Sequence, residues 1–444
     1  MSQNHQSFFY TLFEYAQGKI LEHETLLASF YAEESSFVRF NSGQIRQPGS
    51  VSQTELTLEL VDNKKHLSAT FSLSQNDNDD KQTVDETLAT LRENLQSIPD
   101  DPHFLYATEV NSSENAEAGS LPTAQEITEE ILAEGAGLDF VGILAHGSVA
   151  CGFANSLGQR NWFTRDNFNF DWSVYSHEDK AIKSGYSGFK WDRDILSAKF
   201  AHARKHLDIL KLPPKTLEPG EYKVFLTPAA LSEVLGLLGW FSFSKKAVKT
   251  KQSALLTLVE KQCTLHPTVH INENNNGGVG PMFNSKGFVK ESSIELVSKG
   301  LYSGALTSAR SAREYDVPTD GSNAGETPES LELGAGKLLE KDILTELGDG
   351  LYISNLWYMN FSDRQSCRMT GMTRFATFWV EDGKIQAPVN VMRFDESLYR
   401  MLGENLVGLT QEREHILDAG TYHRRSTNSI NLPGALIEGF RLTL

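Results

Sequence analysis

A proline-rich break near the middle of the chain constrains the fold more than any other sequence feature. Residues 211–220, KLPPKTLEPG, contain three prolines and a glycine. Proline fixes φ and removes a backbone donor, so neither a helix nor a central strand continues through this stretch. The chain has 444 residues, more than one hydrophobic core usually organises. We therefore predict a domain of residues 1–210, a linker of residues 211–220 and a second domain of residues 221–444.

Hydrophobic periodicity predicts an α+β fold for the first half, with antiparallel sheets and helices. Apolar side chains recur at helical spacing in four stretches, residues 6–24, 84–98, 124–134 and 194–210. Strands are predicted in residues 36–45, 55–73, 138–163 and 167–176. Residues 55–73 alternate apolar and polar side chains, as in a hairpin with one buried face, and residues 167–176 carry aromatic side chains at alternate positions. Residues 138–163 are predicted to form two strands, a turn at NSLG and a further strand.

The remaining segments complete this outline. Residues 108–124 are rich in Ser, Asn and Glu and predict a surface loop. After the linker, strand-like segments with glycine turns predominate and helices are few. The second domain is therefore predicted to be β-rich.

Composition excludes several classes of function. Forty-one basic and 58 acidic residues give a formal charge of −17, and the basic clusters are short and scattered. Such a chain repels phosphate backbones, so we expect no direct nucleic-acid partner. The three cysteines form no CxxC pair, which suits a reducing compartment. No basic leader or long apolar run is present, so we expect a cytoplasmic protein without membrane contact.

Candidate catalytic motifs are weak. HARKH places His202 and His206 one helical turn apart, but the glutamate of a zinc-peptidase helix is missing. We interpret the pair as the solvated flank of an amphipathic helix. Ser242 and Lys245 match S-x-x-K without its companion motifs, and together with Cys367 they are the only nucleophile candidates. Residue chemistry alone therefore predicts no catalysis.

The order of segments along nearly the whole chain resembles the TldD/PmbA (TldE) family of metallopeptidase-related proteins. The resemblance rests on SFVRFNSGQIRQ, VACGFANSLGQRNWF, GDGLYISNLWYMN, LPGALIEGFRLTL and above all TGMTRFATFWVEDGKIQAPV, residues 370–389. It implies an N-terminal α+β domain beside a β-rich C-terminal domain. It also implies a dimer that encloses a cavity, where main-chain pairing holds an extended peptide.

The chain departs from the metal-binding pattern of this family. In TldD-type members, two histidines of an HExxxH helix and a cysteine near the C-terminus hold the metal. Here residues 227–240 contain no histidine, Glu233 has no neighbouring ligand, and residues 422–436 contain no cysteine. Cys367 lies too early in the sequence to replace it. The chain thus resembles the TldE/PmbA type, for which we expect no metal, no other cofactor and no catalytic residue.

The resemblance implies a subunit that binds extended peptides and supports a zinc-bearing TldD-like partner. The alternative is a stand-alone homodimer that binds peptides or regulates without peptidase activity. Five residues are candidates for peptide contact: Trp357, Thr370, Gly371, Thr373 and Arg374. The competing interpretation is that these are strand and turn residues that serve only the fold.

Overall fold

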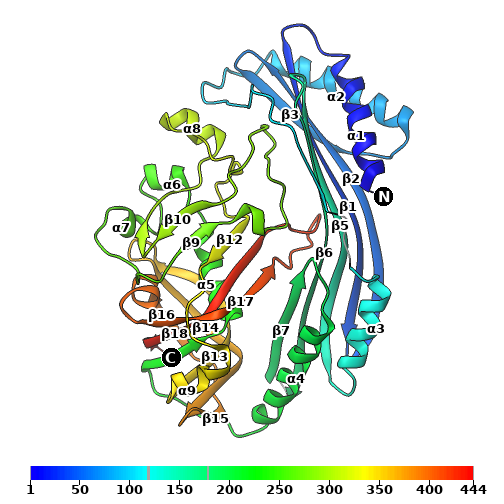
Figure 1. Cartoon of the computed structure of the whole chain (residues 1–444). Helices are drawn as coiled ribbons and strands as arrows, with labels where there is room; N and C mark the ends of the chain where they lie inside the picture. The colour runs from blue at the N-terminus through cyan, green and yellow to red at the C-terminus, as the bar shows by residue number, and fades with distance from the viewer. Residues whose placement is uncertain (1, 118–120, 178–179, 444) are drawn as a thin grey trace.

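Two large sheets face each other in the computed structural model, which describes residues 2–117, 121–177 and 180–443 (Figure 1). The first sheet has seven strands, joined in the order β3-β2-β1-β5-β6, with both β4 and β7 pairing with β6. The second sheet has eleven strands and lies entirely in the second half of the chain. The predicted α+β fold is confirmed. Residues 118–120 of the predicted 108–124 loop lie outside the described residues.

The N-terminal sheet is built from strands of up to 19 residues. Its strands are β1 (Glu24–Asn41), β2 (Gln44–Asp62), β3 (Lys65–Ser72), β4 (Ser113–Glu117), β5 (Phe140–Asn155), β6 (Arg160–His177) and β7 (Lys180–Gly188). Its helices are α1 (Ser2–Gln17), α2 (Asp77–Leu95), α3 (Ala124–Glu134) and α4 (Arg193–Leu210). Within residues 108–124, predicted as loop throughout, β4 is an additional short strand parallel to β6.

Two boundaries differ from the sequence prediction. The first helix ends at Gln17 instead of near residue 24, because the chain turns at Gly18 and enters β1 at Glu24. Residues 140–155 form one continuous strand instead of two. Gly147, which suggests a break, lies inside this strand with φ +149°, and a Cβ there would approach the Glu34 carbonyl oxygen to 2.0 Å. Glycine thus permits close strand pairing here.

The helices cover only one face of the N-terminal sheet. α1 and α2 pack over one part, with Phe9, Phe13 and Leu88 in the core beneath them. α3 and α4 cover another part, where Phe168 and Phe170 of β6 meet Phe200 of α4. Even-numbered side chains of β1 and β6 point into these cores, so odd-numbered ones point to the opposite face. That opposite face, here called the inner face, looks toward the C-terminal sheet (Figure 1).

The C-terminal half contains a closed ring of five strands. β8 pairs with β13 and β18, and the ring continues from β13 through β14 and β16 to β18. The strands of this sheet are β8 (Gly220–Leu226), β9 (Ile271–Glu273), β10 (Ile294–Ser298), β11 (Leu301–Tyr302), β12 (Ser330–Leu333), β13 (Gly350–Asp363), β14 (Arg368–Glu381), β15 (Lys384–Pro388), β16 (Arg393–Ser397), β17 (Leu406–Leu417) and β18 (Ser429–Leu442). Ring closure satisfies backbone groups that an open sheet would leave unpaired.

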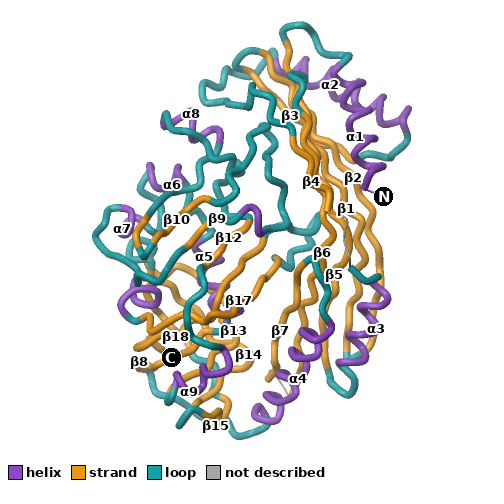
Figure 2. The backbone as a smooth tube through the Cα atoms, viewed as in Figure 1, coloured by secondary structure: helices purple, strands orange, loops and turns teal. Residues whose placement is uncertain are grey.

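Helices of this half are short, as Figure 2 shows. They are α5 (Pro228–Leu238), α6 (Lys245–Lys249), α7 (Leu256–Val259), α8 (Ala309–Tyr315) and α9 (Ile343–Leu347), with single turns η1 (Asn275–Gly277), η2 (Glu340–Asp342) and η3 (Arg400–Glu404). Thr227 caps α5 through its side chain and Pro228 occupies the first turn. Leu231, Val234 and Leu235 of α5 are fully buried in the same core as the ring strands. No helix in the described residues is long and apolar enough to cross a membrane.

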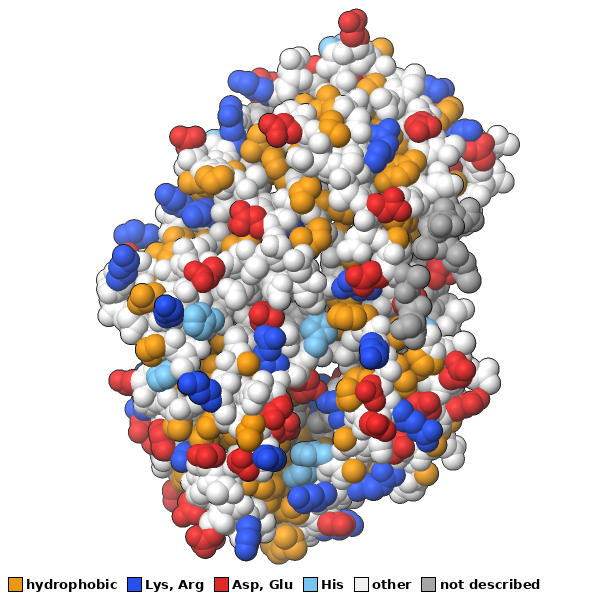
Figure 3. Space-filling view, viewed as in Figure 1, with side chains coloured by type: hydrophobic (Ala, Val, Ile, Leu, Met, Phe, Trp, Pro, Cys, Tyr) orange, Lys and Arg blue, Asp and Glu red, His pale blue; other side chains and the backbone are white. Residues whose placement is uncertain are grey.

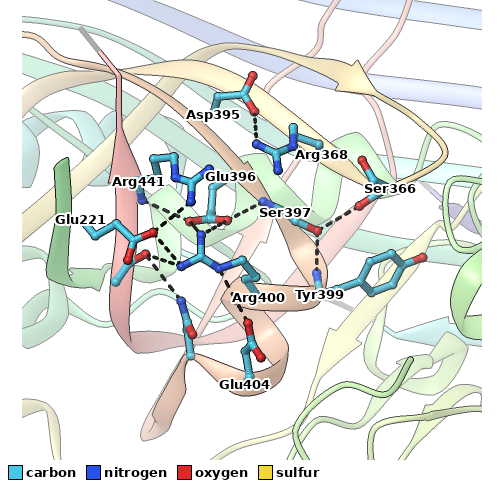
Figure 4. Close-up of polar contacts among 12 residues, drawn as sticks. Glu221, Ser366, Arg368, Asp395, Glu396, Ser397, Tyr399, Arg400, Glu404 and Arg441 are labelled. Atoms are coloured by element: carbon cyan, nitrogen blue, oxygen red, sulfur yellow. Dashed lines mark hydrogen bonds and ion pairs between the residues drawn. The ribbon is translucent and has the colours of Figure 1, made fainter. Parts of the chain in front are cut away.

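A polar cluster holds the ring together where β8, β16 and β18 meet (Figure 4). Glu221 accepts hydrogen bonds from Arg441 at 3.0 Å and from Arg400 at 3.1 Å. These two guanidinium groups, Arg441 first, hold the pKa of Glu221 below its usual range. Arg400 also pairs with Glu396, whose side chain is almost fully buried. The cluster therefore supports the fold, since its charges are mutually satisfied.

Contacts of several kinds join the two halves. α4 packs against Phe378 of β14 as well as against the N-terminal sheet. The side chain of Phe283 enters the apolar part of the inner face. Lys286 pairs with Glu59 of β2.

Residues 211–219 form neither helix nor strand, and the backbone amide of Lys215 bonds the Pro388 carbonyl at 2.7 Å. The boundaries 1–210, 211–220 and 221–444 remain a prediction.

Candidate functional site

The inner face of the N-terminal sheet changes from apolar to polar along its length. On β1 the odd-numbered residues run from Leu27, which packs beside Phe283, to Glu33, Ser35 and Arg39. Strand pairing aligns this polar end with β5 and then with Asn167, Asn169 and Asp171 of β6. A sheet face with this many amides and charges, looking at another part of the same protein, is a candidate binding surface.

The loop of residues 418–428, between β17 and β18, lies across this polar face. Asn169 Nδ2 donates to the Leu417 carbonyl at 3.2 Å, and Gln53 Nε2 donates to the His423 carbonyl at 2.8 Å. Side-chain amides of the sheet therefore hold the main chain of the loop. Because amides bond backbone groups of any residue, this face has chemistry suited to extended peptide segments.

Arg425 anchors the loop from below. It is only 5% exposed, and its guanidinium donates to Ser35 Oγ at 3.4 Å, the Gly147 carbonyl at 3.4 Å and the Asn167 carbonyl at 3.1 Å. Its backbone amide donates to Glu33 Oε2 at 3.0 Å. Burial lowers the pKa of Arg425, and the Glu33 carboxylate opposes that shift. The backbone amide of Arg425 and the charge of its side chain both act on Glu33, and together they fix the loop.

A groove of about 250 Å³ opens between the loop and strands β1, β2 and β5. Its lining residues are Glu33, Phe37, Arg39, Gln47, Pro48, Gly49, Val51, Gln53, Ile143, Thr421, His423 and Arg424. The guanidinium of Arg424 lies 4.3 Å from the ring centre of Tyr31, a cation–π contact that orients it. Burial, and then the Glu33 charge, raise the pKa of Tyr31, so this ring keeps its hydroxyl proton. Figure 3 shows a hollow between the two parts of the molecule, rimmed by side chains of both charges.

The helix in the position of the expected metal-binding helix is α5. Its buried side chains are alanine, leucine and valine, and Glu233 points to solvent. The loop of residues 418–428 carries Arg424 and Arg425 and no cysteine. Within residues 2–117, 121–177 and 180–443, no group of three or more His, Cys, Asp and Glu side chains is placed to hold a metal ion.

Two of the five predicted peptide-contact residues come together at a pair of β-bulges in β13 and β14. The guanidinium of Arg374 lies 4.5 Å from the ring centre of Trp357, which is 46% exposed. Tyr358 and Phe375, with φ of +58° and +57°, mark two of the three irregular positions in this strand pair. Aromatic residues with a left-handed backbone conformation are uncommon in strands and often occur at functional sites. This exposed stack forms a second candidate surface, apart from the groove lining.

The other three predicted residues are engaged in the sheet. Thr370 Oγ1 donates to the Phe394 carbonyl at 2.8 Å, and Thr373 Oγ1 accepts from the Met392 amide at 3.0 Å. Gly371 lies so close to its neighbours that a Cβ would approach the sulfur of Met359 to 2.7 Å. These contacts hold the bulged strands in place. Whether any of the five binds a peptide stays a prediction.

The interpretation of HARKH as a solvated helix flank is wrong for His206. This side chain is 5% exposed, lies 5.2 Å from the Phe378 ring centre, and burial lowers its pKa. Its Nδ1 bonds the His202 carbonyl at 2.8 Å. The prediction failed because α4 has neighbours on two sides, the sheet and β14, whereas one apolar seam suggests only one.

The three nucleophile candidates lie in unsuitable surroundings. Ser242 is fully buried and its hydroxyl has no hydrogen-bond partner among the described residues, so it does not bond Lys245. Cys367 is fully buried in the C-terminal core, where burial raises its pKa. A buried thiol with a raised pKa is unreactive.

Sequence reasoning missed the polar inner face and Arg425. A signal was present in NFNFDW, where Asn167, Asn169 and Asp171 alternate with aromatic residues. Amides and acids at every second position indicate a sheet face that meets something polar. Arg425 carried no comparable signal, because its partners are 258 to 392 residues away in the chain.

Comparison with known proteins shows the family to which the chain belongs. Residues 219–444 match the family described as the PmbA/TldA metallopeptidase C-terminal domain. The match spans half of the chain and includes the ring, α5 and the loop of residues 418–428. The chain therefore belongs to the PmbA/TldA metallopeptidase family. A search of curated proteins found no matching relative.

Solved structures share the fold over almost the whole chain. TldE from Thermococcus kodakarensis aligns with a TM-score of 0.77 and 12% identity, covering 98% of this chain and 100% of that protein. A candidate DNA gyrase modulator from Thermotoga maritima aligns at 0.76 with 14% identity, covering 98% and 99%. Another, from Bacteroides thetaiotaomicron, aligns at 0.72 with 16% identity, covering 98% of each. At these identities the likeness concerns the fold.

Proposed function

We propose that this chain is a non-catalytic, peptide-binding subunit of TldE/PmbA type that supports proteolysis by a TldD-type partner carrying the metal. One observation carries the proposal. The chain has the family fold, yet α5 contributes only Ala, Leu and Val to its buried side, and the loop of residues 418–428 carries Arg424 and Arg425 where a cysteine ligand is expected. Without ligands no water is activated, so hydrolysis falls to the partner.

Peptide binding is proposed for the groove beneath the 418–428 loop. The side-chain amide of Gln53, which lines this groove, already bonds the main-chain carbonyl of His423, and Asn169 bonds the Leu417 carbonyl on the same sheet face. An extended peptide presents the same groups, which favours binding with little dependence on side-chain identity. Trp357 and Arg374 are proposed as a second contact on the exposed bulge, with Thr370, Gly371 and Thr373 holding that bulge in shape.

The test measures binding and cleavage separately. Binding of fluorescein-labelled, N-acetylated octapeptides to the purified chain is followed by anisotropy. Cleavage is followed by mass spectrometry, with the chain alone and after mixing with a TldD-type protein that carries HExxxH. We expect binding by the chain alone and faster cleavage by the mixture. The proposal fails if the chain binds no peptide, or if adding it leaves cleavage by the HExxxH protein unchanged.

A variant pair tests the exposed bulge as a contact surface. Trp357→Ala and Arg374→Gln remove the exposed stack without touching the groove lining, and each is expected to weaken peptide binding about two- to fivefold, the effect of losing one exposed contact. Tyr422→Ala is the control, since Tyr422 is 90% exposed and lies outside the groove lining. Equal binding by all three variants would remove the bulge from the proposed contact surface.

A further inference from the structure

We propose that the groove selects acidic peptides, with Arg39 and Arg424 each receiving a carboxylate. This inference rests on the proposed peptide-binding function and names its substrate class. Both arginines line the groove and are exposed. Neither forms a hydrogen bond or an ion pair with a carboxylate of the described residues, whereas many other basic side chains of this acidic protein do so. Their planar guanidinium groups match the geometry of a carboxylate.

The remaining charges of the groove do not cancel these two. Glu33 is the one carboxylate in the lining, and it is 1% exposed. Its Oε2 accepts from the Gln53 side chain at 3.0 Å, from the Tyr31 hydroxyl at 3.3 Å and from the Arg425 amide at 3.0 Å. The buried guanidinium of Arg425 balances its charge. A ligand in the groove therefore meets two free positive charges.

The positions of the two arginines predict the spacing of the two carboxylates in a bound peptide. Arg424 lies over the ring of Tyr31, near the end of β1 where Glu33 is the first residue of the groove lining. Arg39 lies at the other end, six residues after Glu33 along β1. Six residues of strand span about 20 Å, so an extended peptide bridges both arginines with carboxylates about six residues apart.

The acidic surface of the protein makes this groove selective. At a net charge of −17, the surface as a whole repels acidic ligands. Only a place where positive charge is locally unpaired attracts them. Main-chain contacts with the sheet amides explain binding of peptides in general, and the arginines add a preference among them.

The experiment compares N-acetylated, C-terminally amidated octapeptides built from Ala, Ser, Thr and Gly. A neutral peptide is the reference; others carry one glutamate near either end, two adjacent glutamates, or two glutamates six residues apart. A final pair, the neutral peptide as free acid and as amide, tests whether a C-terminal carboxylate serves as well as a side chain. We expect the doubly acidic, spaced peptide to bind about tenfold more tightly than the neutral one. Added salt should reduce this difference.

Variants assign the preference to the two side chains. Arg39→Gln and Arg424→Gln should each lower the affinity advantage of the spaced acidic peptide over the neutral peptide about threefold. Arg46→Gln is the matched control, because Arg46 is exposed on β2 but does not line the groove. Binding that ignores peptide charge, or equal losses in the Arg46 variant, would overturn acidic selectivity while leaving peptide binding intact. Failure of every peptide to bind would instead refute the proposed function.

Discussion

At the scale of single residues, Arg425 contributes more to the structure of the candidate site than any other side chain. It is buried, its guanidinium bonds three strands of the inner face, and its charge offsets that of Glu33. Removing one member of a buried charge pair leaves the other uncompensated. Arg425 therefore determines whether the loop of residues 418–428 stays on the sheet.

Arg425→Met should lower the free energy of unfolding by about 3–5 kcal/mol, because Glu33 is left buried without its counter-charge. Urea unfolding followed by circular dichroism measures this loss. The double variant Glu33→Gln, Arg425→Met should recover part of it. Arg424→Gln is the control, since Arg424 is exposed. A loss for Arg425→Met no larger than for Arg424→Gln would contradict this account of the loop.

Glu273 gives a prediction for pH dependence. It is 3% exposed, one carboxylate oxygen has no partner among the described residues, and burial raises its pKa to about 7. Its ordinary value is 4.5, so between these pH values the folded state holds a proton that the unfolded state has lost. Stability therefore falls as pH rises across this window, by on the order of 3 kcal/mol in total.

Glu273→Gln should flatten the pH dependence of stability between pH 4.5 and 7, because the amide does not ionise. Denaturation midpoints at several pH values measure the slope. Glu346→Gln, an exposed position, serves as the control and should keep the original slope. An unchanged slope in the Glu273 variant would show that another group controls stability in this range.

At the scale of elements, sequence periodicity predicted the helices well and the strand boundaries less well. The helix predicted for residues 124–134 occurs as α3 with those bounds, because Thr123 and Glu126 form a capping box at its start. In contrast, β5 was divided in the prediction. Glycines suggest breaks when only sequence is read, but at Gly147 the missing side chain lets β1 and β5 approach each other.

Gly147→Ala should destabilise the protein by about 2–3 kcal/mol, because the added Cβ would collide with the Glu34 carbonyl and the backbone conformation there favours glycine. Thermal unfolding measures the effect. Gly49→Ala is a matched control in β2 of the same sheet, where a Cβ would meet nothing within 4 Å. If both variants unfold at the same temperature, close pairing at Gly147 does not limit the stability of the sheet.

At the scale of the whole molecule, α4 connects the two halves. Its residues Leu196 and Phe200 share one core with β6 and with Ala376 and Phe378 of β14. The sequence predicts a linker at residues 211–220; residues 211–219 form neither helix nor strand, and Gly220 begins β8. The sequence did not reveal the shared core, because an apolar seam on a helix does not show how many other elements pack against that helix.

The wild-type chain should therefore unfold in a single calorimetric transition. Phe378→Ala should lower its stability by about 3–5 kcal/mol through the cavity left in the shared core. Tyr358→Ala, at a side chain that is 74% exposed, should change it little. Two separate transitions in the wild type would mean that the halves fold independently of this core.

The closed ring shows where prediction from sequence ends. A β-rich second half could be predicted from alternating residues and glycine turns. The pairing of β8 with β18 could not, because Val224 and Ile437, which face each other, are more than 200 residues apart. The same distance problem applies to the groove, where the loop of residues 418–428 meets β1 and β2. The absence of an HExxxH motif, in contrast, is evident directly from the sequence of residues 227–240.

Metal-dependent cleavage by the purified chain tests the central claim most directly. The chain, loaded with Zn²⁺ and then dialysed, is assayed for bound zinc and for cleavage of the labelled octapeptides with and without a chelator. We predict peptide binding, less than one tightly held zinc ion per chain and no cleavage that the chelator abolishes. Stoichiometric zinc together with chelator-sensitive cleavage by this chain alone would contradict its assignment as a non-catalytic subunit.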